Sequence, residues 1–102
     1  MPKQVLVLWR DIPSQVILQK GRKREKAMLS ERFQEAIDRA AMRAGKGSSD
    51  LYLAEWKRET SQFNSDTDLQ TLAAEKAAEI EAEWSDERLL NAIRAHGLEE
   101  MG

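Results

Sequence analysis

The 102-residue sequence contains no cysteine and only one histidine. Without cysteine, the chain can form neither a disulfide framework nor a thiolate metal site, and we expect a reducing compartment. With His96 alone, Ser-His-Asp, Cys-His and histidine-rich metal sites all lack a required residue. We therefore identify no catalytic residue and no metal site, and we expect no cofactor. We expect His96 to be a cation that the dipole at a helix end favours.

Long apolar runs are also missing from the sequence. The longest continuous run spans about five residues, whereas a helix needs about 20 to cross a bilayer. The first three residues lead directly into an apolar segment and do not resemble a signal peptide. We expect a cytoplasmic protein without a membrane partner. Because 41% of the residues are apolar, a single domain over residues 1–102 is the most economical organisation.

The clearest fold signal lies near the N-terminus. Two short apolar runs rich in β-branched residues are typical of strands buried on both faces, and they occupy residues 5–8 and 16–18. Residues 10–14 contain a proline and predict a chain reversal. Gly21 predicts a second reversal, after which residues 25–29 can return as an edge strand. The sequence thus predicts an antiparallel hairpin or three-stranded sheet within residues 4–29.

The remaining two-thirds of the chain carries helical signals. Capping residues and apolar spacing predict four helices, over residues 31–44, 50–58, 67–84 and 86–96. Ser30, Asp66 and Ser85 are the expected caps of three of them, and the acidic residues of 67–84 are expected to face solvent. For 50–58 a fourth strand is the alternative, because apolar residues also alternate there. The segment 59–65 is polar and predicts a mobile loop. The expected class is α+β.

Charge is distributed unevenly along the chain. The net charge is −2, yet residues 1–58 carry 13 Lys and Arg against 7 Asp and Glu, and residues 59–102 carry 3 against 11. This split either neutralises itself within the fold or steers a charged partner. The densest cluster sits at the tip between two predicted strands and could grip the phosphates of a nucleic acid: Lys20, Arg22, Lys23, Arg24 and Lys26. The alternative is a solvated turn that protects a sheet edge.

A second candidate site is the end of the first strand. Trp9, Arg10 and Asp11 place an indole, a guanidinium and a carboxylate beside the predicted turn. These groups either close the core and pair locally or form a binding corner. If the second helix packs beside this end of the sheet, the corner also includes Tyr52, Trp56 and Arg58.

Three strings of the sequence, VLVLWRDIPSQV, LSERFQEAIDRAAMRAG and DLYLAEW, carry a family resemblance. The chain resembles the small bacterial "virulence factor" family, found alone in proteobacteria and as a terminal segment of a larger conserved virulence factor. The resemblance is best over residues 3–58. Because such members are encoded beside methylenetetrahydrofolate reductase and corrinoid or folate-dependent methyltransferases, it implies a partner role in one-carbon metabolism. The resemblance identifies no individual site residue.

Three function hypotheses follow. The first is a non-catalytic accessory domain that binds another protein, a folate-linked one-carbon enzyme, through the corner around Trp9 and Trp56. The second is a nucleic-acid-binding module that uses the basic cluster at residues 20–26. The third is an enzyme in which Asp11 and Arg10 act on a bound substrate.

Overall fold

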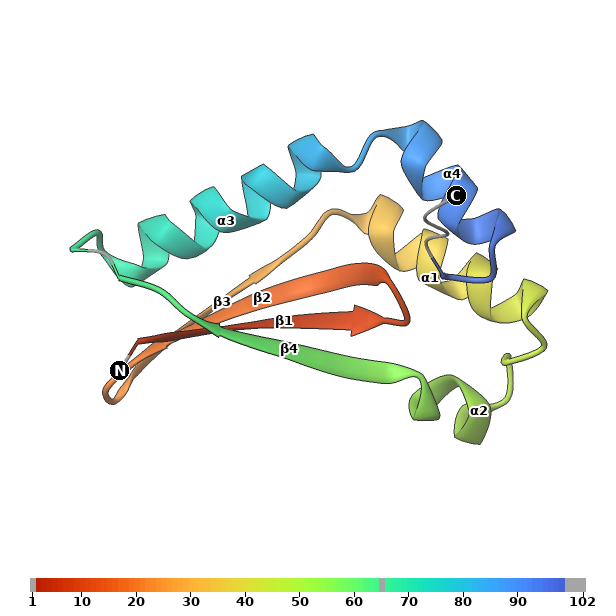
Figure 1. Cartoon of the computed structure of the whole chain (residues 1–102), viewed down its shortest axis with the longest axis horizontal. Coiled ribbons are helices and arrows are strands. Elements are labelled where there is room, and N and C mark those ends of the chain that lie inside the picture. Colours follow the sequence, from red (N-terminus) through yellow and green to blue (C-terminus); the bar gives the residue numbers. More distant parts are fainter. Residues whose placement is uncertain (1, 65, 99–102) are drawn as a thin grey trace.

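The protein folds as a four-stranded antiparallel sheet with four helices (Figure 1). The computed structural model describes residues 2–64 and 66–98. The elements follow the chain as β1 (Lys3–Trp9), β2 (Ile12–Lys20), β3 (Lys23–Met28), α1 (Glu31–Arg43), α2 (Ser49–Ala54), β4 (Trp56–Gln62), α3 (Leu69–Glu83) and α4 (Asp86–Arg94). The strand order across the sheet is β3-β2-β1-β4. The expected α+β class with an N-terminal antiparallel sheet is confirmed.

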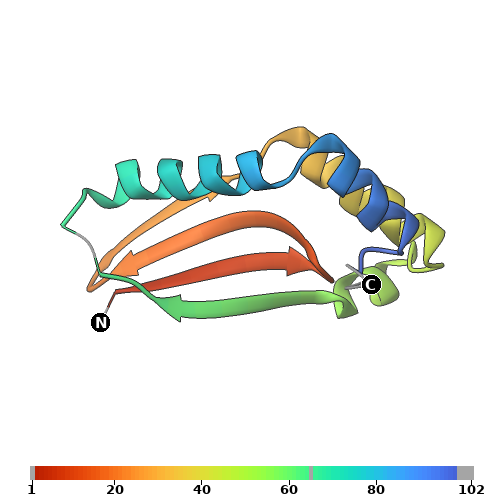
Figure 2. The same ribbon diagram turned by 45° about the horizontal axis from the view of Figure 1, so that its top comes forward.

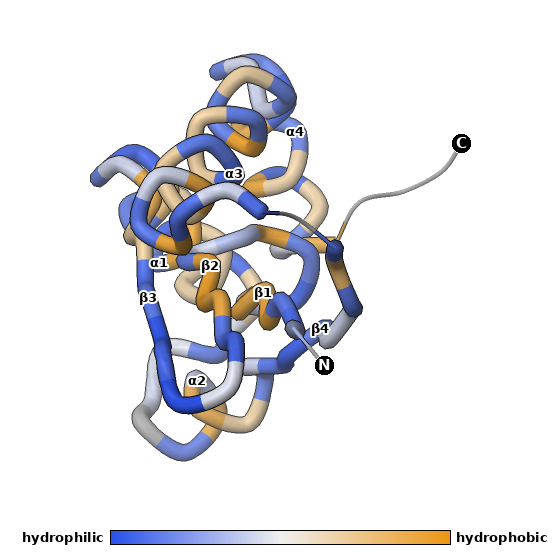
Figure 3. Tube along the Cα trace, turned by 90° about the vertical axis from the view of Figure 1, so that its left-hand side faces the viewer, coloured by the Kyte–Doolittle hydropathy of each residue, from blue (hydrophilic) through white to orange (hydrophobic). Residues whose placement is uncertain are grey.

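Three of the helices lie on one side of the sheet (Figure 2). Helix α3 packs on β2 and β3, while α1 packs on α4 and on the end of β2. Helix α2 lies on the opposite side from α4, at the end of β4, as Figures 1 and 3 both show. The helices therefore cover one face of the sheet and leave most of the other uncovered.

The strand register decides which side chains the helices cover. Leu18 and Val16 of β2 are fully buried against α3, in a cluster with Leu69, Leu72 and Ala73. Alternate residues point the other way, because successive side chains of a strand face opposite sides of the sheet. On that uncovered face Val5 and Ile17 lie opposite each other, and Val7 joins them.

A larger core fills the end of the sheet where β1 turns into β2. The apolar side of α1 lies here against α4, as its alanine-rich spacing predicts. The buried members of this cluster are Trp9, Ile12, Leu29, Phe33, Ala36, Ile37, Ala40, Ala41, Trp84, Leu89, Ala92 and Ile93. The last two helices are thus needed to cover apolar groups of the first half of the chain.

The predicted helix over 50–58 is wrong in its second half. Helix α2 ends at Ala54, and the chain continues as β4, so the expected loop over 59–65 is also wrong for residues 59–62. Residue 65 lies outside the described residues. Strand β4 pairs with β1 along its whole length without a register shift. All of its residues after Trp56 are exposed, so β4 lacks the apolar alternation by which a strand is recognised in a sequence.

Several element ends also differ from the prediction. The β1–β2 turn consists of Arg10 and Asp11 alone, and Pro13 lies within β2 opposite Leu8 at a register shift. Helix α3 begins at Leu69 and not at residue 67, because its cap is Asp68, whose carboxylate accepts from the amide of Thr71. Helix α4 ends at Arg94, and its predicted cap is confirmed. Two residues further on, His96 adopts a left-handed conformation with φ of 62°.

Candidate functional site

Trp9 is the centre of the predicted binding corner, and it is fully buried. Its indole Nε1 donates a hydrogen bond of 2.8 Å to the carbonyl oxygen of Tyr52, and the two rings stack with centroids 6.0 Å apart. Trp56 contacts the Tyr52 ring edge-on, at 5.8 Å between centroids. Offset and edge-to-face contacts are the arrangements that aromatic quadrupoles favour. The three rings thus join β1, α2 and β4.

Arg10 ties three elements together. The residue has φ of 52°, a left-handed conformation that is uncommon outside glycine. Its Nε donates to Glu55 Oε2 at 3.0 Å, and its Nη1 donates to the carbonyl oxygen of His96 at 2.8 Å. Lys46 approaches the other Glu55 oxygen at 3.7 Å. Because a guanidinium holds its donors in a fixed fork, this arrangement sets the position of α2 and of the end of α4 relative to the turn.

The carboxylate of Asp11 completes the corner. It accepts a hydrogen bond from Lys57 Nζ at 3.2 Å, and its backbone amide donates to the carbonyl oxygen of Gly97 at 2.8 Å. The structure therefore brings five of the six predicted corner residues together: Trp9, Arg10, Asp11, Tyr52 and Trp56. The polar side-chain groups of Trp9, Arg10, Asp11 and Tyr52 are engaged within the chain, and partner binding by these residues stays a prediction. Arg58, the sixth residue, lies two positions along β4 opposite Val7, on the uncovered face.

The uncovered face carries a charge pattern that the sequence alone did not reveal. Val5, Val7 and Ile17 form its aliphatic centre. The register places four cations around them, namely Lys3, Arg24, Lys26 and Arg58. Among the described strand residues on this side there is no carboxylate, because Glu25 and Glu59 pair with residues of the opposite face. We call this surface the basic sheet face.

Gln15 lies on the basic sheet face, at the end nearest the β1–β2 turn. It pairs with Val7 on one side and with Met28 on the other. Its side-chain oxygen is buried and accepts no hydrogen bond from the described chain. A buried acceptor without a donor costs about 1–3 kcal/mol, so this oxygen lowers the stability of the sheet by about that amount.

The basic cluster at residues 20–26 is divided by the pleat of the sheet. Arg24 and Lys26 belong to the basic sheet face, whereas Lys20 and Lys23 pair with each other at the end of the hairpin. A hollow of about 460 Å³ separates this end from the start of α3, and its walls are Lys20, Arg22, Lys23, Asp66, Thr67, Asp68 and Leu69. Two carboxylates thus oppose three of the cations. The five cations therefore do not share one face of the sheet.

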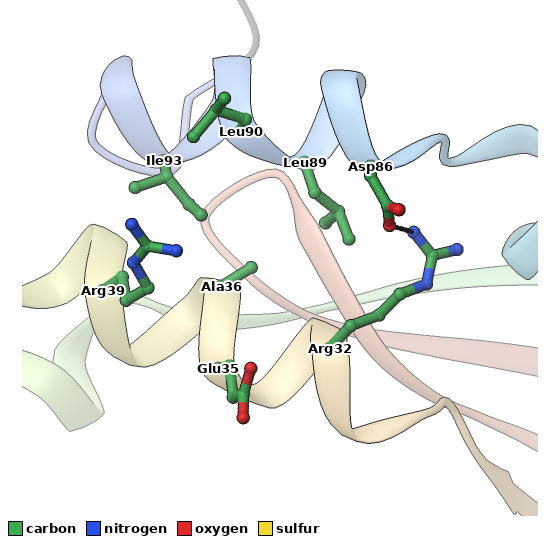
Figure 4. A pocket seen from close by; sticks show the side chains of 8 residues that line it. All are labelled: Arg32, Glu35, Ala36, Arg39, Asp86, Leu89, Leu90 and Ile93. Atoms are coloured by element: carbon green, nitrogen blue, oxygen red, sulfur yellow. Dashed lines mark hydrogen bonds and ion pairs between the residues drawn. The ribbon is translucent and has the colours of Figure 1, made fainter.

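A groove of about 260 Å³ runs between α1 and α4 (Figure 4). Arg32 lies at one end, where its Nη1 contacts Asp86 Oδ1 at 3.1 Å and its Nη2 contacts Glu81 Oε1 at 3.1 Å. Leu89 and Ile93 of α4 form an apolar wall opposite Ala36. Because two carboxylates already pair with Arg32, we assign this groove to the packing of the two helices.

Glu81 links α3 to the first turn of α1, although its spacing predicted a solvent-facing side chain. Its carboxylate accepts hydrogen bonds from the Ser30 amide at 2.6 Å and from the Ser30 hydroxyl at 2.9 Å. Ser30 is the N-cap as expected, but its side chain bonds Glu81 and not its own helix. Burial raises the pKa of Glu81, yet the hydrogen bonds from Ser30 and the Arg32 guanidinium outweigh it and hold that pKa below its usual range.

The described residues contain neither a side-chain cluster suited to a metal ion nor a helix suited to crossing a membrane. Within residues 2–64 and 66–98, no three His, Cys, Asp or Glu side chains gather closely enough to hold a metal ion. In the same part of the chain, no helix has both the length and the apolar character to cross a bilayer.

Comparisons with known proteins give one match. Neither the curated proteins nor the solved structures contain a match to this sequence or fold. A family model described as "Virulence factor" matches residues 7–93, a span that includes part of β1 and nearly all of the elements after it. The matched span covers most of the chain, and the protein belongs to the Virulence factor family.

Proposed function

We propose that this protein is a cytoplasmic, non-catalytic accessory domain that binds another protein through the basic sheet face. The observation that carries the proposal is the segregation of charge on the sheet. Four cations surround an aliphatic centre without a carboxylate among the described strand residues, although the whole chain is acidic. A surface of one sign steers a partner of the opposite sign and fixes its orientation.

The chemistry of this face defines the partner. Its aliphatic centre of Val5, Val7 and Ile17 is buried, so the adjoining Met28, which is 60% exposed, is the apolar group that a partner can contact. Trp56 borders the same cluster and is half-buried. A surface of acidic residues with an apolar group opposite Met28 is complementary to this face. The family resemblance supplies the candidate for such a partner, which is a folate-linked enzyme such as methylenetetrahydrofolate reductase or a methyltransferase.

Charge reversal tests the proposal. A tagged copy purified from its native host should retain a stoichiometric protein partner, and the same partner should bind the purified chain. Lys26→Glu with Arg58→Glu should weaken that binding at least about tenfold, since each change sets a like charge against the acidic surface. Arg39→Glu is the matched control, because it reverses an exposed cation on α1, away from the sheet. Equal loss in the control and the double variant contradicts the proposal, as does recovery of the chain without a partner.

The second candidate function is nucleic-acid binding by Arg24 and Lys26 together with the cations at the hairpin end. The same charge segregation supports it, but the centre of the face is aliphatic, whereas bases stack on aromatic rings. If all five cations of residues 20–26 each neutralise one phosphate, the logarithm of affinity for duplex DNA falls with the logarithm of salt with a slope of about −4 to −5. A flat salt response rules out this candidate.

A further inference from the structure

The outer edge of β4 is a second surface that the proposed function does not use. Strand β4 is the last strand of the sheet, so one edge pairs with β1 and no described strand pairs with the other. An unpaired strand edge presents a row of amides and carbonyls that can hydrogen-bond another strand. Seven residues with no proline, no glycine and no register shift make this edge regular over its whole length.

The two edges of the sheet differ in their protection. Edge strand β3 carries three cations, Lys23, Arg24 and Lys26, and cations on an edge discourage pairing with another strand. Helix α3 also packs on β3. Strand β4 carries its charged residues Lys57, Arg58 and Glu59 in its first half only, and the exposed second half, from Thr60 to Gln62, is uncharged. The fold thus protects one edge and leaves the other open to a second strand.

We propose that β4 pairs with β4 of a second copy of this chain, in antiparallel orientation, to form one continuous eight-stranded sheet. The two-fold axis is perpendicular to the sheet, as a symmetric edge-to-edge dimer requires. Each face of one sheet then continues into the same face of the other. Residues that lie opposite each other across the new ladder therefore come from the same face of the sheet. This condition allows only registers in which one residue of β4 pairs with the same residue of the second copy.

The charges of β4 disfavour some of these registers. A register centred on Arg58 places the two Arg58 side chains opposite each other, and a register centred on Glu59 places the two Glu59 carboxylates opposite each other. Both registers are unfavourable because like charges repel. Centring on Thr60 places Arg58 opposite Gln62 of the second copy and Glu59 opposite Ser61 of the second copy, with the two Thr60 hydroxyls in the middle. The charged half of each strand then faces the uncharged half of the other. Strand β4 is self-complementary in this register.

The end of the ladder supplies an apolar contact. Phe63 is half-buried beside a hollow of about 330 Å³ whose other walls are Pro2, Gln62 and Asn64. In the Thr60-centred register, Lys57 of the second copy lies opposite Phe63. Lys57 pairs with Asp11 of its own chain, so covering the ring with its aliphatic stem requires that this exposed pair opens.

Single substitutions at Thr60 test both the pairing and its register. Sedimentation velocity of the full chain, over concentrations from about 1 µM to about 1 mM to detect a small interface, should show dimers that dissociate on dilution. Thr60→Lys and Thr60→Glu should each be monomeric, because each sets like charges opposite each other on the two-fold axis. An equimolar mixture of the two variants should recover the dimer. Thr60→Val, which keeps the pairing without adding charge, is the matched control and should dimerise like the wild type.

Three results overturn the proposal. The first is a wild-type chain that stays monomeric over the whole concentration range. The second is a dimer that persists in both charged variants, which places the interface elsewhere. The third is an equimolar mixture that stays monomeric, which contradicts the Thr60-centred register. Thr60 is exposed, so thermal melting like that of the wild type should confirm that each variant is folded.

Discussion

Replacing Gly97 by alanine tests whether the turn after α4 fixes Trp9. Gly97 has φ of 87°, and a Cβ added there would lie 2.7 Å from Trp9 Cζ3 and 3.1 Å from Trp9 Cε3. Trp9 cannot move away easily, because its indole is hydrogen-bonded to Tyr52 and stacked on that ring. The added methyl group must therefore displace either the indole or the turn.

The magnitude follows from two contributions. A residue with a Cβ in the left-handed region costs about 1–2 kcal/mol, and overpacking a buried site adds about 1–3 kcal/mol. We expect Gly97→Ala to lower the free energy of unfolding by about 2–5 kcal/mol. Gly45→Ala is the matched control, because Gly45 has φ of 72° after α1 but no atom within 4 Å of an added Cβ. It should cost about 1–2 kcal/mol, the conformational part alone.

Urea denaturation of both variants, followed by circular dichroism, measures the difference. The gain from restricting the unfolded chain is the same for both glycine-to-alanine changes and cancels in the comparison. The near-ultraviolet spectrum of Gly97→Ala should also change, because Trp9 lies at the clash, while that of Gly45→Ala should not. Equal stability losses in the two variants would refute the argument that Gly97 is required by its contact with Trp9.

Two further predictions concern the second half of the chain. Glu81→Gln should cost about 1 kcal/mol at neutral pH, because it removes the charge that the first turn of α1 binds. The pKa of Glu81 is lowered in the folded state, so the contribution of its carboxylate to stability is fully present above pH 4.5 and is lost as the pH falls further. The urea midpoints of the wild type and of Glu81→Gln should therefore converge at acidic pH. Glu79→Gln, which changes an exposed glutamate of the same helix, is the control and should leave stability unchanged. Deleting residues 66–102 should leave an insoluble or molten fragment, because burying each large apolar side chain contributes about 1.5–3 kcal/mol to the stability of the fold. A cooperative urea transition of the fragment 1–65 would contradict this prediction.

Local chemistry made the first half of the fold predictable. The β-branched runs at residues 5–8 and 16–18 read correctly as central strands, and the alanine-rich spacing of 31–44 read correctly as a helix that packs by one face. The cap at Ser85 was also recognisable, because its side chain bonds an amide of its own helix. These features depend on residues close to one another in the sequence.

Parts of the candidate site were not predictable for the opposite reason. Strand β4 is polar and exposed, and it forms because β1 offers an edge to pair with, although the paired residues lie between 47 (Trp9 and Trp56) and 59 (Lys3 and Gln62) positions apart. In the sequence, Glu81 cannot be distinguished from a solvent-exposed helical glutamate. Its role follows only from the packing of α3 beside Ser30 in the folded protein. Long-range contacts of this kind leave no periodic signal in the sequence.

The sequence by itself determined the α+β class and the antiparallel hairpin, since each rests on local patterning, whereas the contact of Trp9 with Tyr52 joins residues 43 positions apart and depends on the tertiary structure. The tertiary structure alone decided that Arg10 joins α2 to the end of α4, and that Lys3, Arg24, Lys26 and Arg58 share one face without a carboxylate. The physical reason is register: a shift of one residue in any strand would move all of its side chains to the other face. That register is set by pairing across the sheet, which the order of residues along one strand does not specify.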